Sequence, residues 1–325
     1  MKKLQQRSQN KLLDWFQKHK RNLPWRRTKD PYSIWISEVM LQQTTSKAVI
    51  PYYIKFLKKF PHLKKLSQAK KTEVFSLWSG LGYYRRAENL IKAAQELQKL
   101  GRFPKSYKEL LLLPGFGDYT SRSVASLAFK EAVGVVDGNV IRLFSRFYET
   151  GFQWWKTKDK KELQARADLW VQGFDSSLMN QALMELGSLI CVSQQPLCLL
   201  CPISKDCKAF KNKTQNQFPL KRIKKSKELW YWSLQKITKN SKWAFVKNKK
   251  TPFLKDKILF PGTLKKVSSK PKQYDFSHNI MNYQIFVHVK SMPFKKKKNQ
   301  ELQWFTKNQA KKLNPSSLIE KVFTL

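Results

Sequence analysis

The sequence predicts a mainly α-helical protein that carries a smaller α/β domain at its C-terminal end. From the N-terminus to about residue 207, apolar residues recur at the three- and four-residue spacing of helices. Residues 208–228 are basic and polar and predict a linker. Beyond them, short aromatic and β-branched runs predict strands. A chain of 325 residues is long enough for two such domains, at 1–207 and 229–325.

The predicted elements follow one another in a clear order. Asp30 and Pro31 suit a helix start, because proline favours the first helical turn. Helices are predicted within residues 30–60, 72–81, 85–100, 106–113, 160–174 and 178–191. Strands are predicted at residues 229–237, 243–247, 283–290 and 302–306, before a final helix that begins at Ser316 or Ser317.

The net charge is extreme. The chain has 64 basic and 22 acidic residues, a formal charge of +42, and both predicted domains are basic. Such a chain favours polyanions, and nucleic acid is the obvious one. Only 12 of the basic residues are arginine, however, and a lysine- and asparagine-rich composition is also typical of an A/T-rich genome. Charge alone therefore supports nucleic-acid binding only weakly.

The sequence shows no sign of a membrane segment or a secretion signal. It has no run of about 18 uncharged apolar residues, and its basic N-terminus lacks an apolar core and a cleavage site. We therefore expect a cytoplasmic protein that does not bind membranes.

Residues 111–129, LLLPGFGDYTSRSVASLAF, predict a hairpin between two helices. Gly115 and Gly117 allow positive φ angles and a close approach of the backbone to a ligand. The second helix presents free N–H groups and a positive dipole end, which bind anions. This arrangement can grip a DNA phosphate without reading the base sequence. An ordinary connection between two helices is the alternative.

Two carboxylates are candidates for catalysis. Glu38 lies in an otherwise apolar helix, where burial raises the pKa of a carboxyl group and produces a usable general acid. Asp137 precedes a helix and can cap it, and capping N–H groups lower the pKa and keep the group ionised. The simpler alternatives are an exposed helical glutamate and a plain N-cap, and the sequence alone does not show that the two residues meet.

All four cysteines of the chain lie within residues 191–207, in the pattern Cys-x6-Cys-x2-Cys-x5-Cys. In a cytoplasmic chain, clustered cysteines favour metal binding over disulfides. Four thiolates suit either Zn²⁺ or a [4Fe–4S] cluster, and the spacing taken alone favours zinc without excluding the cluster.

The ordered set of motifs resembles the adenine DNA glycosylases of the MutY type, within the helix–hairpin–helix superfamily that includes endonuclease III. The resemblance covers residues 10–207. It is carried by PYSIWISEVMLQQT, LWSGLGYYRRAENL, LPGFGDYTSRSVASLAF, VVDGNVIRLFSRF and NQALMELGSLIC, followed by the four cysteines.

The resemblance implies a two-lobed fold with DNA in the cleft. A six-helix barrel would span about residues 30–136, and residues 1–29 and 137–207 would form an iron–sulfur lobe. The cysteine spacing matches the one that this superfamily uses for a [4Fe–4S] cluster, so the ligands would be Cys191, Cys198, Cys201 and Cys207. The cluster would brace a loop on DNA, where Lys205 and Lys208 could meet phosphate.

The resemblance also implies a reaction. A monomer would bind double-stranded DNA and flip out an adenine that is mispaired with 8-oxoguanine or guanine. Glu38 would protonate adenine N7, and Asp137 would stabilise the sugar cation, as paired carboxylates do in glycoside hydrolysis. By the same resemblance, Tyr119 and Asn139 would assist the two catalytic groups. Trp25, Arg26 and Gln181 would line the adenine pocket. The residues around the opposite base would be Gln43, Thr44, Leu81 and Tyr83.

Two rival functions remain. In endonuclease III, a hairpin lysine forms a Schiff base and cuts the backbone, but Tyr119 holds that position here. We therefore expect a monofunctional glycosylase with little lyase activity of its own. The second rival is a lesion-binding protein without catalysis, against which the presence of both Glu38 and Asp137 argues.

The C-terminal domain resembles the MutT-like (Nudix) domain of the same family more weakly. Phe276, Ser277 and His278 match a loop that would touch the oxidised guanine, and residues 258–266 resemble a degraded proline–glycine loop. The Glu-rich Nudix box is missing, and only five acidic residues follow Cys207, too few to hold Mg²⁺ for hydrolysis. We expect lesion recognition, with non-specific DNA affinity as the alternative.

Overall fold

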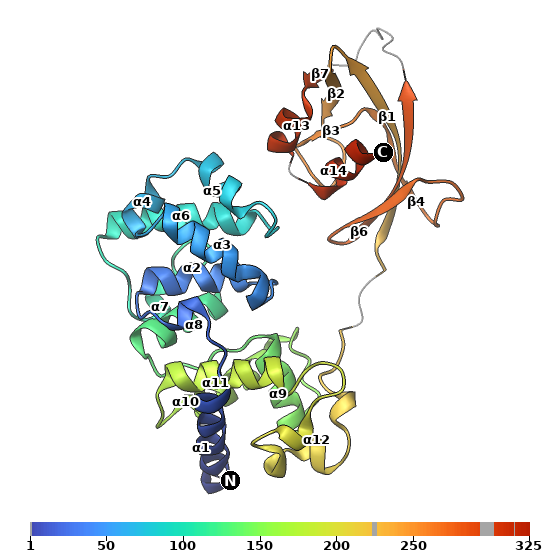
Figure 1. Ribbon diagram of the computed structural model, residues 1–325. Helices are drawn as coiled ribbons and strands as arrows, with labels where there is room; N and C mark the ends of the chain where they lie inside the picture. The colour runs from blue at the N-terminus through green and yellow to red at the C-terminus, as the bar shows by residue number, and fades with distance from the viewer. Residues whose placement is uncertain (1, 223–225, 293–301, 315) are drawn as a thin grey trace. The chain divides into compact units, whose positions relative to one another are not determined.

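The computed structural model describes residues 2–222, 226–292, 302–314 and 316–325 and contains two compact units. The first unit ends at Arg222 and is helical, and the second contains a β-sheet with two helices (Figure 1). No helix in the described part of the chain is long and apolar enough to cross a bilayer. The predicted combination of a helical region and a smaller α/β domain is confirmed.

The first lobe of the helical unit is built by the helices from α2 to α8. Asp30 caps α2 by accepting hydrogen bonds from the N–H groups of Tyr32 and Ser33, and Pro31 occupies the first helical position, as predicted. Thr45 caps the next helix. The bounds are α2 Pro31–Leu41, α3 Ser46–Lys59, α4 Leu63–Ser67, α5 Lys71–Trp78, α6 Arg85–Leu100, α7 Tyr107–Leu110 and α8 Asp118–Phe129.

The second lobe combines the two ends of the helical unit. Helix α1 (Lys2–His19) lies beside α11 (Ser176–Leu189), although more than 150 residues separate them in the sequence (Figure 1). The lobe also contains α9 (Gly138–Phe147), α10 (Thr157–Val171), α12 (Lys208–Lys211), and the 3-10 turns Cys198–Leu200, Ser204–Asp206 and Gln215–Gln217. A further turn, Pro24–Arg26, connects α1 to α2.

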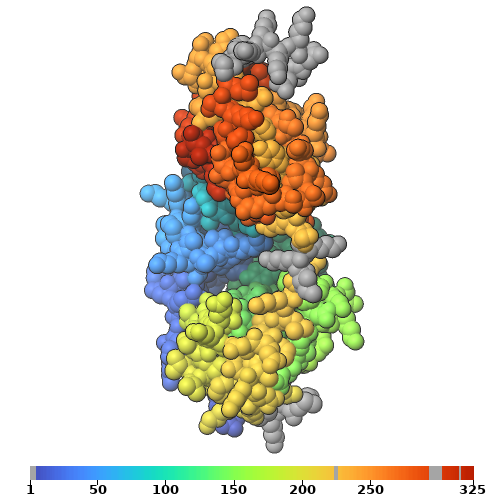
Figure 2. Space-filling view, turned by 90° about the vertical axis from the view of Figure 1, so that its right-hand side faces the viewer, coloured from blue at the N-terminus to red at the C-terminus, as the bar shows by residue number. Residues whose placement is uncertain are grey.

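Each lobe has its own hydrophobic core. The first core is centred on the fully buried Trp35 and Trp78, and the second on Trp170 and Phe144. In the space-filling view, the blue helices of the first lobe and the yellow and gold cysteine region form separate parts of the unit's surface (Figure 2). The chain passes from the first lobe to the second at residues 130–137, between α8 and α9.

The first part of the predicted linker packs onto the second lobe. Ala209 is fully buried, and Arg146 donates to the carbonyl oxygens of Gln215 (2.8 Å) and Phe218 (3.0 Å). Glu149 accepts hydrogen bonds from Asn212 and Thr214. Residues 208–222 therefore belong to the first unit, because the buried Arg146 needs their carbonyl oxygens as partners. Residues 223–225 of the predicted linker lie outside the described residues.

The C-terminal unit is a mixed sheet with the strand order β3-β2-β1-β6-β5, in which β4 also pairs with β1 and β7 with β2. The long central strand β1 runs parallel to β6 and antiparallel to β4, and helices cover the core around Trp232 and Phe245. The bounds are β1 Glu228–Lys239, β2 Lys242–Lys247, β3 Ile258–Leu259, β4 Gly262–Val267, β5 Phe276–Ile280, β6 Tyr283–Met292, β7 Gln303–Phe305, α13 Lys307–Leu313 and α14 Ser317–Thr324.

The four predicted strands are present, and Ser316 caps the final helix, as expected. The prediction of a loop at residues 276–278 is wrong. Phe276, Ser277 and His278 form the start of β5, which pairs with β6 at the edge of the sheet. Because strand residues alternate between faces, Ser277 points away from the face shared by Phe276 and His278. The charged end of Lys321 on α14 lies 5.8 Å from the Phe276 ring, which places that shared face toward the helix.

Candidate active site

Helices α2, α8, α9 and α11 bring the predicted catalytic residues to the junction of the two lobes. Glu38, Tyr119 and Asp137 come from three different elements and line one cavity of about 510 Å³. This volume lies in the range of small-molecule sites. Five further predicted residues line the same cavity: Trp25, Arg26, Thr44, Asn139 and Gln181. The pairing of Glu38 with Asp137, which the sequence alone left open, is therefore present in the structure.

Glu38 is a buried acid that two hydroxyl groups hold in place. Its side chain on α2 is 3% exposed, and its Oε2 accepts hydrogen bonds from the hydroxyls of Tyr119 (2.8 Å) and Ser123 (2.6 Å). Tyr119 and Ser123 are one turn apart on α8 and so present both hydroxyls to the same carboxyl oxygen. Burial raises the pKa of Glu38, as predicted, and the negative charge of Asp137 adds to the rise, whereas the two hydrogen bonds and Arg26 oppose it.

Asp137 caps α9 and is partly exposed to the cavity. Its Oδ1 accepts from the N–H of Val140 (2.8 Å), and its Oδ2 accepts from the side-chain amide of Asn139 (2.8 Å). The predicted cap is therefore confirmed. The expected direction of the pKa shift is wrong: burial raises the pKa of Asp137, and it outweighs the lowering effect of Val140, Asn139 and the Arg142 charge.

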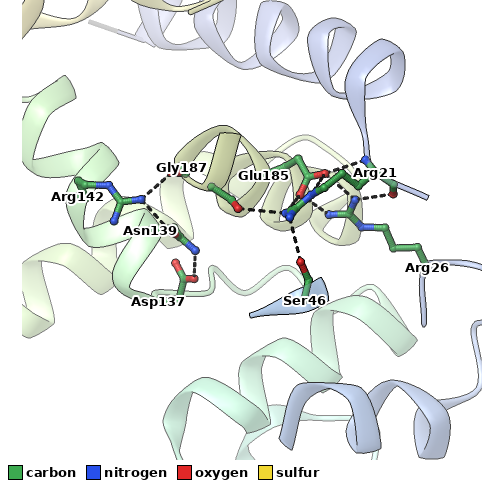
Figure 3. A network of polar contacts seen from close by, with 9 residues as sticks. Arg21, Arg26, Ser46, Asp137, Asn139, Arg142, Glu185 and Gly187 are labelled. Atoms are coloured by element: carbon green, nitrogen blue, oxygen red, sulfur yellow. Dashed lines mark hydrogen bonds and ion pairs between the residues drawn. The ribbon is translucent and has the colours of Figure 1, made fainter. Parts of the chain in front are cut away.

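Arg142 orients the amide that supports Asp137 (Figure 3). Its guanidinium donates to Asn139 Oδ1 (2.9 Å) and to the carbonyl oxygens of Gly187 (2.6 Å) and Cys191 (2.6 Å). Because Oδ1 of Asn139 accepts from Arg142, the amide nitrogen faces Asp137. Sequence reasoning missed Arg142, although its position on the α9 face that carries Asn139 was a possible signal.

Glu185 on α11 is a second buried glutamate in the cavity, and sequence reasoning missed it. Its carboxylate accepts bidentate hydrogen bonds from Arg26 (2.9 Å and 2.9 Å) and a hydrogen bond from Arg21 (2.6 Å) (Figure 3). Arg21 also donates to Ser46 Oγ (3.0 Å), which links the second lobe to α3. Although burial opposes the shift, hydrogen bonds from Arg21 and Arg26 hold the pKa of Glu185 at about 2.

The hairpin has the geometry of a phosphate site. Helix α7 ends before Gly115, and Gly117 precedes α8 without a capping side chain, so the first N–H groups of α8 are free for a ligand. Gly115 has a φ of +78°, and a Cβ at this position would lie 2.6 Å from Asn89 Cβ. Only glycine therefore fits this turn.

A second cavity of about 650 Å³ joins the hairpin to Asp137. Gln43 lines it beside Gly115 and Gly117, and Trp154 and Lys160 form part of its wall. Trp154 is 41% exposed although it is a large aromatic residue. Sequence reasoning missed Trp154 and Lys160, because nothing in their spacing separates them from the neighbouring aromatic and basic residues.

Comparison with known proteins decides the family. Residues 36–172 match the family described as HhH-GPD superfamily base excision DNA repair protein. An adenine DNA glycosylase of Buchnera aphidicola subsp. Acyrthosiphon pisum is 37% identical over 256 residues, which are 77% of this chain and 72% of the relative. The chain belongs to the adenine DNA glycosylase family. The human adenine DNA glycosylase is 41% identical over 217 residues, which are 63% of this chain and 40% of that protein.

Solved structures agree with this adenine DNA glycosylase fold. A thermostable thymine-DNA glycosylase is 31% identical, with a TM-score of 0.60 over 65% of this chain and 98% of that chain. A trapped endonuclease III–DNA covalent intermediate has a TM-score of 0.54 at 23% identity, over 63% of this chain and 94% of that chain, and shows the fold alone. These matches cover 65% and 63% of this chain and support its helical architecture.

The residues that the adenine DNA glycosylase resemblance places around the opposite base lie on two segments. Gln43 and Thr44 follow α2, and Leu81 and Tyr83 precede α6. Tyr83 is 61% exposed, whereas Leu81 is 6% exposed and packs into the core of the first lobe. In this structure Tyr83 is therefore the more accessible side chain of its segment.

The four cysteines line one cavity, separate from the one that contains Glu38. Mostly apolar residues complete its lining, together with Arg146, Ser204 and Gln215, and Arg146 donates to Cys191 Sγ at 3.4 Å. Burial raises the pKa of the Cys201 thiol to about 12 and that of Cys207 to about 11. Among the described residues, no three His, Cys, Asp or Glu side chains form a compact metal-binding group. Four thiols in a shared apolar cavity nevertheless fit the donor set of an iron–sulfur centre.

Proposed function

We propose that this protein removes adenine from double-stranded DNA by hydrolysing its N-glycosidic bond. The observation that carries the proposal is the cavity in which the buried, hydroxyl-bonded Glu38 meets Asp137. The names of the relatives support adenine as the base that is removed. The adenine would enter flipped out of the stack, between the pocket residues Trp25, Arg26 and Gln181.

Glu38 is suited to act first as the acid. Both hydroxyl donors bind Oε2, so Oε1 is the oxygen available to carry the proton. Transfer of this proton to adenine N7 lets the C1′–N9 bond break with its electron pair on the base, which leaves as neutral adenine. The sugar is left as an oxocarbenium-like cation, and Glu38 is left as a carboxylate that can take a proton from the attacking water.

Asp137 is suited to stabilise the cation. Its carboxylate accepts from Val140 and Asn139, and both hydrogen bonds favour the ionised form that opposes a developing positive charge. Covalent capture of C1′ by Asp137 followed by hydrolysis would give the same products. The network through Arg142 keeps the carboxylate in place during either route.

The decisive experiment compares the wild type with Glu38→Gln. The wild type should release adenine from duplexes with 8-oxoguanine or guanine opposite adenine, and Glu38→Gln should bind the same duplexes without release. A lesion-binding protein without catalysis would show no release in either form.

We propose further that the enzyme is monofunctional. Tyr119 occupies the hairpin position and donates its hydroxyl to Glu38, so it offers no amine for a Schiff base. Incubation with an adenine:8-oxoguanine duplex should produce strand breaks only after base or heat is applied. Breaks that appear without treatment would favour the bifunctional, endonuclease III-type alternative.

The second cavity is the proposed path of the DNA strand. The N–H groups after Gly117 would bind one phosphate, and Lys160, which lines the same cavity, would meet another. Lys160→Ala should remove one phosphate contact. The slope of log affinity against log salt concentration should then become shallower by about one. Lys161→Ala is the matched control, because Lys161 is also exposed on α10 and does not line the cavity.

We propose that Cys191, Cys198, Cys201 and Cys207 hold a [4Fe–4S] cluster. The cluster would brace the loop structurally, and exposed Lys205 and Lys208 would let that loop meet phosphate. Arg146 would donate to the Cys191 sulfur and to the backbone around it. Purified protein should be brown and contain iron and acid-labile sulfide, whereas a colourless protein with stoichiometric zinc would contradict the proposal.

The C-terminal unit is proposed to recognise the oxidised guanine through the edge strand β5. Ser277 faces away from α14, whereas burial and the charge of Lys321 lower the pKa of His278. Ser277→Ala and His278→Ala should reduce the preference for 8-oxoguanine over guanine. An unchanged preference, with weaker binding to all duplexes, would favour non-specific DNA affinity.

A further inference from the structure

Arg86, in the first turn of α6, joins the two segments that carry the proposed contacts to the opposite base. Its Nη1 donates to the carbonyl oxygens of Val39 (2.8 Å), Met40 (3.1 Å) and Gln42 (2.7 Å), at the end of α2. Its Nη2 donates to the carbonyl oxygens that precede Tyr83, at Leu81 (3.0 Å) and Gly82 (3.4 Å). One guanidinium therefore links two loops that are about forty residues apart in the sequence.

The chemistry of this contact requires arginine. The guanidinium lies over the rings of Trp78 (5.4 Å) and Tyr83 (5.7 Å), and its hydrogen-bond acceptors are backbone carbonyl oxygens. Carbonyl oxygens at the end of α2 carry the negative end of the helix dipole, which favours a cation there. A planar fork of donors can reach several carbonyl oxygens and stack at the same time, whereas a lysine ammonium is a single point charge.

The two loops are conformationally strained where Arg86 holds them. Gln43 has a φ of +57° and Tyr83 a φ of +48°, in the left-handed region that residues other than glycine seldom adopt. Such conformations persist when surrounding contacts determine them. The hydrogen bonds of Arg86 to Gln42 and Gly82 act on the residues directly before these two positions.

We propose that Arg86 is a positioning residue that sets the spacing between the Gln43–Thr44 segment and the Leu81–Tyr83 segment, and thereby determines discrimination of the base opposite adenine. The inference rests on the proposed function, in which these segments contact that base. Arg86 acts through the two loops, because its donors are directed to carbonyl oxygens of the protein. Loss of the link lets the loops move independently while the cavity of Glu38 and Asp137 stays assembled from α2, α8 and α9.

The test measures single-turnover adenine release from two duplexes that differ only in the base opposite adenine, 8-oxoguanine or guanine. The readout is the ratio of the two rate constants. Arg86→Lys should lower this ratio about tenfold, or 1.4 kcal/mol, with a smaller change in release from the guanine duplex. Arg102→Lys is the matched control, because Arg102 is exposed and pairs only with Glu109 among the described residues, and its ratio should equal that of the wild type.

A purely structural role for Arg86 predicts a different result. Both rate constants would fall together with the melting temperature, and an unchanged ratio in folded Arg86→Lys would overturn the proposal. A ratio of one in the wild type would instead overturn the proposed recognition of the opposite base. Failure of the Arg86 proposal can therefore be told apart from failure of the proposed function.

Gly82→Ala keeps the proposal testable if Arg86→Lys does not fold. Gly82 has a φ of +69°, and no heavy atom lies within 4 Å of a Cβ built there, so the substitution strains the loop backbone without a clash. The ratio of the two rate constants should fall in this variant as well. A folded Gly82→Ala with the wild-type ratio would contradict the proposed role of loop spacing.

Discussion

Glu38 and Glu185 are two buried glutamates that line the same cavity, and their pKa values shift in opposite directions. Burial penalises the charged form of both. Glu38 receives hydrogen bonds from two neutral hydroxyls, which do not compensate for that penalty, whereas Glu185 is bound by the guanidinium groups of Arg21 and Arg26. The partner of a buried acid, more than its depth, therefore decides whether it can donate a proton.

The largest expected effect separates the chemical roles of the two acids. Glu38→Gln should slow adenine release by at least about 10²-fold, because general acid catalysis supplies that much or more. Duplex affinity should remain, since Gln preserves the shape of the side chain. Single-turnover release and gel-shift binding on the same duplex measure both quantities, and near-normal release would show that Glu38 is not the acid.

Glu185→Gln should mainly lower the free energy of unfolding, rather than the rate of adenine release. Removing the carboxylate leaves the guanidinium groups of Arg21 and Arg26 without their buried partner, at a cost of roughly 3–5 kcal/mol of unfolding free energy. Denaturant titration measures this loss. A variant with wild-type stability would mean that the Arg21 and Arg26 charges are compensated by water rather than by Glu185.

Ser123→Ala should sharpen the difference between the two acids by raising the pKa of Glu38 further. The Ser123 hydroxyl donates to the carboxylate and favours its ionised form, so its removal extends the protonated form to higher pH. The alkaline limb of the pH profile for adenine release should move to higher pH. Ser121→Ala is the matched control on α8, because Ser121 is fully buried and its hydroxyl has no described hydrogen-bond partner.

The smallest expected effect is the pH dependence of stability, which has opposite signs for the two residues. The lowered pKa of Glu185 means that its stabilisation is present above its ordinary value of 4.5 and is lost as the pH falls toward about 2. The raised pKa of Glu38 means that its stabilisation is present below 4.5 and is lost as the pH rises through the folded-state pKa. Glu38→Gln should therefore be slightly more stable than the wild type at neutral pH, and thermal melts across pH measure this difference.

Much of the site could be predicted from the sequence because its residues lie in short motifs with characteristic neighbours. Glu38 in an apolar helix, Asp137 before a helix and the glycines of the hairpin each have a local physical signature. The direction of the Asp137 pKa shift could not be predicted, because capping is local whereas desolvation depends on all the surrounding elements. Phe276, Ser277 and His278 were expected in a loop, and their pairing with β6 makes them strand residues.

The sequence by itself determined the helical region, the C-terminal strands, the family resemblance and the candidate acids, because periodicity, capping and motif spacing are properties of neighbouring residues. Only the tertiary structure decided which distant groups meet. It joined Glu38 to Tyr119 and Ser123, paired Glu185 with Arg21 and Arg26, and placed Arg86 on the carbonyl oxygens of two loops. The partners in these contacts, which include backbone carbonyl oxygens, have no signature in the sequence. The contacts exist only once the helices have packed.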